Sequence, residues 1–261
     1  MSLDYEQFKT RVYALTHIDL NAYKERQMKR RIDALISKNK YIGYADYVEA
    51  LKSNKELFEE FVNYLTINVS EFFRNPDLWV KLEKEILPEL ITKASGKPLR
   101  VWSAACSTGD EPYSLVMTLS RLMPLDKIKI IATDIDKQVL EKAQVGLYNE
   151  KSVAGVPADL KAKYFTKIGE KNYQIADSIK KCVEFKKHNL LTDPYPKDLD
   201  LIVCRNVVIY FTDEAKTEIY KKFNESLKSD CILFVGSTEQ IINAKELGFN
   251  SMKSFFYRKV N

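Results

Sequence analysis

Apolar side chains recur every three or four positions through the first quarter of the chain, which is the spacing of one helical face. One such face consists of Tyr5, Phe8, Val12 and Leu15. Three further helices are predicted over residues 23–38, 44–52 and 55–65. No alternating strand pattern occurs in this part of the sequence. We therefore predict an all-α N-terminal domain over residues 1–70.

The pattern changes from Pro98 onward, where short apolar runs alternate with helical segments. The predicted strands cover residues 100–103, 129–133, 199–204, 232–235 and 255–259, and the predicted helices cover 111–123, 137–143, 214–227 and 241–247. Such alternation favours a parallel sheet with helices on both faces. We predict an α/β domain over residues 71–261, and its first helix begins at Asn75-Pro76, with Asn75 as the cap.

A looser pattern between Gly146 and Leu191 predicts an insertion into this domain. Tyr164-Phe165, Tyr173-Gln174-Ile175 and Val183-Glu184-Phe185 alternate as short antiparallel strands do. We expect a small antiparallel β-subdomain at about residues 146–190. It is either an interaction subdomain or a decorated crossover between two sheet strands.

Composition excludes several classes of protein. Four cysteines without a CxxC pair and only two histidines predict no metal site and favour a reducing compartment. No apolar run reaches membrane-spanning length, so we expect a cytoplasmic protein with no membrane insertion. The net charge of +5 is compatible with an acidic partner without requiring one. Nothing suggests an obligate oligomer, and a monomer is expected.

The predicted helix over residues 23–38 opens with a basic run. Its members are Lys24, Arg26, Lys29, Arg30 and Arg31, with Glu25 as the one acid among them. A solvated basic face is the usual meaning of such a run, and a docking surface for an acidic partner is the other. Both interpretations stay open on the residues alone.

The stretch from Val101 to Leu115 organises the second domain. It indicates a buried strand, a turn of small residues and a helix with Asp110 as N-cap. Backbone N–H groups point out of such a turn, which makes it a cofactor position. The single Gly109 gives neither a dinucleotide fingerprint nor a phosphate-binding loop. Cys106 in this turn is either a nucleophile or a small residue that fits a tight bend.

Polar side chains also follow two other predicted strands. Asp134 ends the second strand, where an acid accepts hydrogen bonds from ribose hydroxyls, and Asp136 can cap the next helix. Arg205 and Asn206 follow the strand 199–204, at the edge where open α/β sheets bind ligands. The residues therefore predict a cofactor site built from several strand ends.

Five segments carry a characteristic set of residues in order along the chain: Thr66–Arg74, Trp102–Ser114, Ala132–Asp136, His188–Leu191 and Cys204–Phe211. Together they resemble the CheR-type chemotaxis receptor methyltransferases. The resemblance implies a class I (Rossmann-like) methyltransferase domain with a small inserted β-subdomain, preceded by an all-α domain. It also implies transfer of a methyl group from S-adenosyl-L-methionine to glutamate carboxylates on the cytoplasmic helices of chemoreceptors, with S-adenosyl-L-homocysteine as product.

The resemblance implies roles for individual residues. It places nine residues at the cofactor: Asn68, Ser70, Arg74, Glu111, Asp134, Asn189, Leu190, Arg205 and Asn206. It places two residues, Arg74 and Tyr210, at the substrate carboxylate. A glutamate is already ionised at neutral pH, so the reaction needs no general base. Arg74 and the Tyr210 hydroxyl would hold one carboxylate oxygen and aim the other at the methyl group.

Two departures from the family pattern refine this reading. Asp110 stands where many relatives have Glu, whereas Glu111 is retained. The segment from Phe165 to Val183 is shorter than in relatives whose β-subdomain binds a receptor tether peptide. The resemblance thus implies a tether-independent enzyme that joins receptor arrays through the receptors themselves, with the helix Lys24–Arg31 as a candidate contact.

Two alternatives to receptor methylation remain. A methyltransferase of another substrate, such as RNA, fits the basic balance, but the basic helix lacks interleaved aromatic residues and no nucleic acid is expected. A non-catalytic S-adenosylmethionine-binding module would predict loss of the candidate site residues, and these are present.

Overall fold

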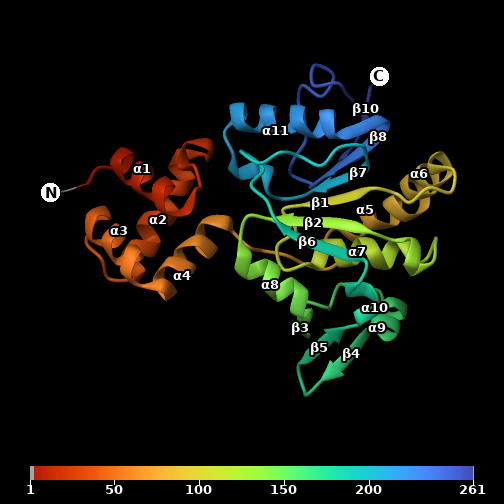
Figure 1. The fold of residues 1–261 in the computed structure, drawn as a ribbon, viewed down its shortest axis with the longest axis horizontal. Coiled ribbons are helices and arrows are strands. Elements are labelled where there is room, and N and C mark those ends of the chain that lie inside the picture. The colour runs from red at the N-terminus through yellow and green to blue at the C-terminus, as the bar shows by residue number, and fades with distance from the viewer. Residues whose placement is uncertain (1–2, 261) are drawn as a thin grey trace. The chain divides into compact units, whose positions relative to one another are not determined.

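The computed structural model describes residues 3–260, which fall into two compact units (Figure 1). The first unit contains residues 3–68 together with Tyr210–Thr217, and the second contains Val69–Ile209 and residues 218–260. Residues 1, 2 and 261, at the outer limits of the two predicted domains, lie outside the described residues. The domain limits 1–70 and 71–261 stay a proposal. No helix among the described residues is long and apolar enough to cross a membrane.

The first unit is a helical bundle. Its helices are α1 (Tyr5–Thr16), α2 (Glu25–Lys38), α3 (Tyr44–Ser53) and α4 (Lys55–Thr66), with the 3-10 turn η1 (Leu20–Ala22) before α2. A capping box starts α1, because Asp4 accepts from the Gln7 N–H and the Gln7 side chain accepts from the Asp4 N–H. Phe8, Ile32 and Phe61 are fully buried between the helices. The prediction of four helices is confirmed.

The segment Tyr210–Thr217 is attached to this unit by backbone hydrogen bonds. The Lys24 N–H donates to the Tyr210 carbonyl oxygen at 2.9 Å, and the Thr212 N–H donates to the Ala22 carbonyl oxygen at 2.8 Å. The rings of Tyr23 and Phe211 pack with their centroids 4.8 Å apart. Tyr210 is thereby fixed beside the start of α2, an attachment that the sequence pattern does not predict.

The second unit is built on a seven-stranded sheet in the order β6-β2-β1-β7-β8-β10-β9. The strands are β1 (Val101–Ala104), β2 (Ile130–Asp134), β6 (Val183–Lys187), β7 (Leu199–Cys204), β8 (Leu227–Val235), β9 (Phe249–Ser251) and β10 (Phe256–Lys259). The first five strands in this order are parallel, whereas β10 and β9 run antiparallel to their neighbours. This arrangement confirms the Rossmann-like α/β class and corrects the expectation of a wholly parallel sheet.

Helices cover both faces of this sheet. The α-helices are α5 (Pro76–Lys81), α6 (Leu87–Ala94), α7 (Asp110–Leu119), α8 (Lys137–Val145) and α11 (Asp213–Ser226). The π-helical turn η2 (Leu82–Ile86) joins α5 to α6, and the 3-10 turns η3 (Leu125–Lys127) and η4 (Val208–Tyr210) lie in connecting segments. Figure 1 shows α7 and α8 on one side of the sheet and α11 on the other. The core of the unit therefore lies in two layers around the sheet.

The insertion forms a separate three-stranded antiparallel sheet, as predicted. Its strands are β3 (Leu147–Asn149), β5 (Asn172–Ile175) and β4 (Phe165–Ile168), in that spatial order, and the short helices α9 (Ala158–Tyr164) and α10 (Asp177–Lys180) flank it. The assignment of Val183–Phe185 to this sheet is wrong, because β6 pairs in parallel with β2 at the edge of the main sheet. An edge strand with one solvated face alternates in the same way as a strand of a small antiparallel sheet.

Three local predictions also need correction. Residues 241–247 form turns instead of a helix. The N-cap of α7 is Gly109, with Asp110 as the first helical residue. Asn75 occupies the N-cap position of α5, but its side chain makes no capping hydrogen bond. The last two differences have a physical cause in the site described next.

Candidate active site

The carboxyl ends of four parallel neighbouring strands bring the candidate residues of the second unit together. Asn189 follows β6, Asp134 ends β2, Glu111 follows β1 and its turn, and Arg205 follows β7. The second unit contains Ser70, Arg74, Glu111, Asp134, Asn189, Leu190, Arg205 and Asn206, whereas Asn68 and Tyr210 belong to the first. The site residues of the second unit therefore share one edge of the sheet, as the strand pattern predicts.

Hydrogen bonds to the neighbouring strand hold the turn after β1 open. The Cys106 N–H donates to the Thr133 carbonyl oxygen at 2.8 Å, and the Ser107 N–H donates to Asp134 Oδ2 at 2.8 Å. Gly109 has φ +89°, and a Cβ there would lie 2.9 Å from the Cβ of Ala143. Glycine is required at this point both by the left-handed backbone and by the close approach of α8.

Two carboxylates lie beside this turn, of which Asp134 is buried and Glu111 is half-buried. Burial raises the pKa of Glu111 to about 7, although the nearby Arg205 charge and the Ser103 Oγ–H, which donates to Glu111 Oε1 at 2.8 Å, both lower it. Burial likewise raises the pKa of Asp134 to about 6, although the hydrogen bonds that this carboxylate accepts from backbone N–H groups lower it. At neutral pH, Glu111 is therefore about half neutral whereas Asp134 is mostly ionised, and an arriving cation would favour the ionised form of both.

Arg205 connects the end of β7 to the linker segment before α5. Its Nη2 donates to the Arg74 carbonyl oxygen at 2.7 Å and to Asn75 Oδ1 at 2.9 Å. The guanidinium also lies 4.8 Å from the ring centroid of Phe234. These contacts explain why Asn75 makes no helix cap, since its side chain oxygen accepts from Arg205. They also hold the backbone of Arg74 beside the sheet edge that carries Glu111, Asp134 and Arg205, which is the candidate cofactor edge.

The linker itself is packed against α7 and the inserted sheet. The Phe73 N–H donates to Ser114 Oγ at 3.1 Å. The fully buried Phe72 ring meets the rings of Tyr148 and Phe165 edge-on, with centroids 4.8 Å and 5.4 Å away. A Cβ on Gly155 would lie 2.6 Å from the Phe72 carbonyl oxygen. The inserted sheet thus supports the segment that carries Arg74.

Non-glycine residues with a left-handed backbone occur in three of these loops. They are Phe73 and Asn75 in the linker, Ala105 and Ser107 in the turn after β1, and Asn206 after β7. This conformation is costly for a residue with a side chain, most of all for a bulky one such as Phe73, and it persists only where the surroundings enforce it. Strain of this kind is typical of functional loops, and the hydrophobic pattern does not reveal it.

The chemistry of the edge fits S-adenosylmethionine. Glu111 and Asp134 provide carboxylate oxygens for a cationic ligand with ribose hydroxyls. Ser107 Oγ and Arg205 Nε are buried and have no hydrogen-bond partner among the described residues, so polar groups remain for a ligand. Ser107 is a site candidate that the sequence analysis missed, and its signal was its place two residues before Gly109. Burial raises the pKa of the Cys106 thiol, which favours the small turn residue over the nucleophile.

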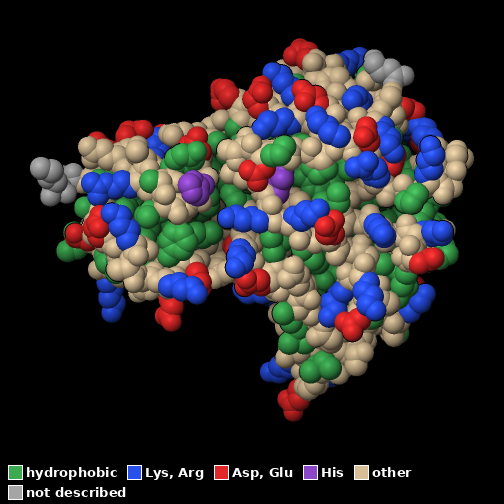
Figure 2. Space-filling view, viewed as in Figure 1, with side chains coloured by type: hydrophobic (Ala, Val, Ile, Leu, Met, Phe, Trp, Pro, Cys, Tyr) green, Lys and Arg blue, Asp and Glu red, His purple; other side chains and the backbone are tan. Residues whose placement is uncertain are grey.

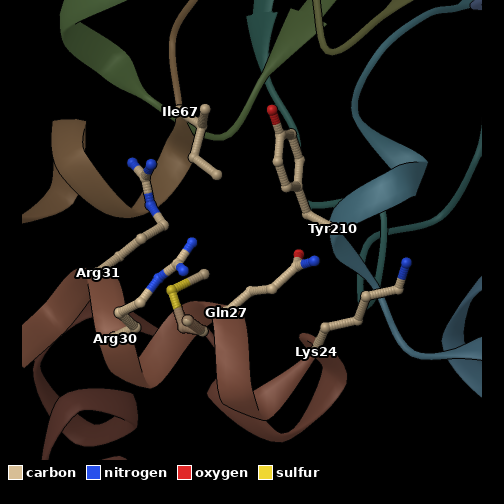
Figure 3. A pocket seen from close by; sticks show the side chains of 7 residues that line it. Lys24, Gln27, Arg30, Arg31, Ile67 and Tyr210 are labelled. Atoms are coloured by element: carbon tan, nitrogen blue, oxygen red, sulfur yellow. The ribbon is translucent and has the colours of Figure 1, made fainter. Parts of the chain in front are cut away.

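Tyr210 lines a pocket of about 180 Å³ in the first unit, together with the basic face of α2. Figure 3 shows Tyr210 across this pocket from the side chains of Arg30 and Arg31, with Ile67 between Arg31 and the tyrosine ring. The remaining lining residues are Lys24, Gln27 and Met28. Two features that the sequence analysis treated separately, the basic run and Tyr210, therefore share one surface.

Comparison with known proteins agrees with this geometry. Residues 68–256 match the family model for the CheR methyltransferase SAM-binding domain, and residues 3–66 match the model for the CheR methyltransferase all-alpha domain. The chain belongs to the CheR methyltransferase family. This membership confirms the resemblance and the cofactor, so the chain is an S-adenosylmethionine-dependent methyltransferase.

Relatives of this CheR chain cover nearly its whole length. A chemotaxis protein methyltransferase from Listeria monocytogenes is 44% identical over 256 residues, which is 98% of this chain and 97% of that protein. A chemotaxis protein methyltransferase from Borreliella burgdorferi is 34% identical over 249 residues, which is 91% of this chain and 88% of that protein. The similarity therefore includes both the helical unit and the cofactor edge.

Proposed function

We propose that the chain is a protein-glutamate O-methyltransferase that esterifies glutamate side chains on the cytoplasmic helices of chemoreceptors for chemotactic adaptation. The observation that carries the proposal is the full-length similarity to proteins named chemotaxis protein methyltransferase. The residues add chemical support, because the candidate site provides carboxylates for a cationic cofactor and arginines for an anionic substrate. An ionised glutamate needs no base to become a nucleophile.

At the cofactor edge, each candidate residue has a role that its chemistry suits. S-adenosylmethionine supplies a methyl group on a positively charged sulfur. Glu111 would face the ammonium end of the ligand and Asp134 its ribose hydroxyls. Ser70, Asn189, Leu190 and Asn206 would complete the lining, whereas the role of Asn68 at the cofactor rests on the family resemblance alone. Arg205 would hold the Arg74 segment against this edge.

At the substrate, Arg74 and Tyr210 would bind the glutamate carboxylate. A guanidinium and a hydroxyl can each donate to one carboxylate oxygen and leave the other oriented for in-line attack. Opposite charges diminish as the methyl group is transferred, so exclusion of water favours the reaction. Catalysis would then consist of orientation by this chain's own side chains and needs no proton transfer.

The pocket of the first unit supports an acidic helical substrate. Lys24, Arg30 and Arg31 provide positive charge on the same surface as the ring of Tyr210. Receptor glutamates presented on a helix would complement that charge and bring a carboxylate towards the tyrosine. Recognition that needs no tether peptide is part of this proposal, and it rests on the shortness of the segment from Phe165 to Val183 relative to tether-binding relatives.

A methyltransferase of RNA is the alternative class. On each unit by itself, the face drawn in Figure 2 has Lys and Arg side chains interspersed with Asp and Glu side chains, not gathered in a continuous basic track. Single-stranded nucleic acid is typically bound along such a track with aromatic side chains between the charges. This distribution favours the protein substrate.

One assay separates these proposals. The protein is incubated with methyl-labelled S-adenosylmethionine and either receptor cytoplasmic fragments or total RNA, and the product is treated with mild base. Glutamate methyl esters release volatile methanol, whereas N-methyl and ribose methyl groups keep their label. We expect base-labile label on the receptor fragments only, and base-stable label on RNA would refute the proposal.

A further inference from the structure

Glu239, a buried residue in the turn after β8, accepts four backbone hydrogen bonds. Its Oε2 accepts from the N–H of Asn206 at 2.5 Å and from that of Gly236 at 2.8 Å. Its Oε1 accepts from the N–H of Val208 at 2.8 Å and from that of Ile209 at 3.3 Å. Three of these four donors belong to the segment that directly follows Arg205.

The surroundings of Glu239 are built for this carboxylate. Gly236 directly follows β8, and a Cβ there would lie 2.5 Å from Glu239 Oε2 and 2.8 Å from the Asn206 nitrogen. Asn206 itself has φ +62°, a conformation that needs support from its neighbours. A carboxylate is the side chain with two oxygens that only accept, so it alone can satisfy four converging N–H groups. The segment 206–209 thus derives its shape from Glu239.

We propose that Glu239 is a positioning residue for methyl transfer. Its carboxylate fixes the backbone of residues 206–209, which orients Asn206 towards the cofactor and keeps Arg205 on the carbonyl of Arg74. The inference rests on the proposed cofactor-binding role of Asn206 and Arg205.

The test compares Glu239→Gln with Glu246→Gln in the full chain. Glu246 is exposed and lies in the turns that follow Glu239, so its replacement removes the same charge without touching this network. Glutamine keeps one accepting oxygen and sets an NH₂ group against the remaining N–H donors. We expect the affinity for S-adenosylhomocysteine, measured by calorimetry, to fall by about tenfold or more in E239Q. Amide hydrogen exchange at residues 206, 208 and 209 should accelerate in the same variant.

The outcomes distinguish this inference from the proposed function. If wild-type protein does not bind S-adenosylhomocysteine, the proposed cofactor edge fails, whatever Glu239 does. If wild-type and E239Q bind equally and the three amides exchange alike, the positioning role is wrong. A lower melting temperature with unchanged affinity of the folded protein would also refute it, since that marks a purely structural residue. If E239Q does not fold, Glu239→Asp replaces it, and unchanged affinity in E239D would equally overturn the inference.

Discussion

Cofactor affinity should depend on pH through the carboxylate of Glu111. Burial raises the pKa of this group to about 7, and the ligand is a cation. A bound cation stabilises the ionised carboxylate and so lowers its pKa in the complex. Binding below pH 7 must therefore release a proton, and the affinity must fall as the pH drops through this value.

The magnitude follows from the ionised fraction of Glu111. A group with a pKa of about 7 is about nine-tenths ionised at pH 8 and about one-tenth ionised at pH 6, so the affinity should fall about tenfold between the two. Asp134, with a pKa raised to about 6, is about half ionised at pH 6 and contributes about a further factor of two. Most of the change should therefore belong to Glu111.

Isothermal calorimetry with S-adenosylhomocysteine, whose ammonium group is retained, measures this effect at pH 6 and pH 8. Two buffers of different ionisation enthalpy then report the protons released on binding, which we expect to be about 1.4 per complex at pH 6, with about 0.9 from Glu111 and about 0.5 from Asp134. Glu111→Gln should bind more weakly at pH 8 and lose most of the pH dependence. A wild-type affinity that is flat between pH 6 and pH 8, or an equal slope in E111Q, would refute the reasoning.

Four further predictions test other parts of the account. Without ligand, E111Q should raise the free energy of unfolding by up to about 3 kcal/mol at pH 8 and leave it unchanged at pH 4.5. The reason is that the Glu111 carboxyl ionises above its usual pKa in the unfolded chain but only near pH 7 in the folded protein. Thermal unfolding at the two pH values measures the difference. Arg74→Ala should lose most of the transfer rate at saturating cofactor, and an unchanged rate would remove Arg74 from the mechanism. Arg30→Glu should raise the KM for receptor fragments several-fold at low salt and leave the cofactor affinity unchanged. Arg26 is an exposed residue of α2 outside the pocket, so Arg26→Glu should raise this KM much less. Gly155→Ala should lower both the melting temperature and the cofactor affinity, because the added Cβ would displace the carbonyl group of Phe72 in the linker. A Cβ at Gly43 would meet no atom within 4 Å, so Gly43→Ala should leave both quantities unchanged.

Much of the fold could be predicted from the hydrophobic pattern. Strands such as β7, buried on both faces, leave an apolar run in the sequence, here Leu201–Cys204, and the helices of the first unit leave a stripe with helical spacing. The pattern could not place Val183–Lys187, because alternation shows that one face is solvated without naming the partner strand. Nor could it find β9, which is only three residues long.

The candidate site was predictable where side chains follow strands directly, as at Asp134 and Arg205. It was not predictable where backbone groups make the contacts. Glu239 accepts only from N–H groups, so its partners leave no mark on the side-chain pattern. The attachment of Tyr210 to the first unit is likewise a matter of backbone hydrogen bonds to Lys24 and Ala22, between segments far apart in the sequence.

The central claim is that the methyl group ends on a glutamate carboxyl of a chemoreceptor. Its most direct measurement is peptide mass spectrometry of a receptor cytoplasmic fragment after incubation with S-adenosylmethionine, with wild-type protein and with R74A in parallel. We predict the mass increment of one methyl group on glutamate-containing helical peptides, lost after mild base and nearly absent with R74A. A base-stable increment, or methylation of any residue other than glutamate, would contradict the account.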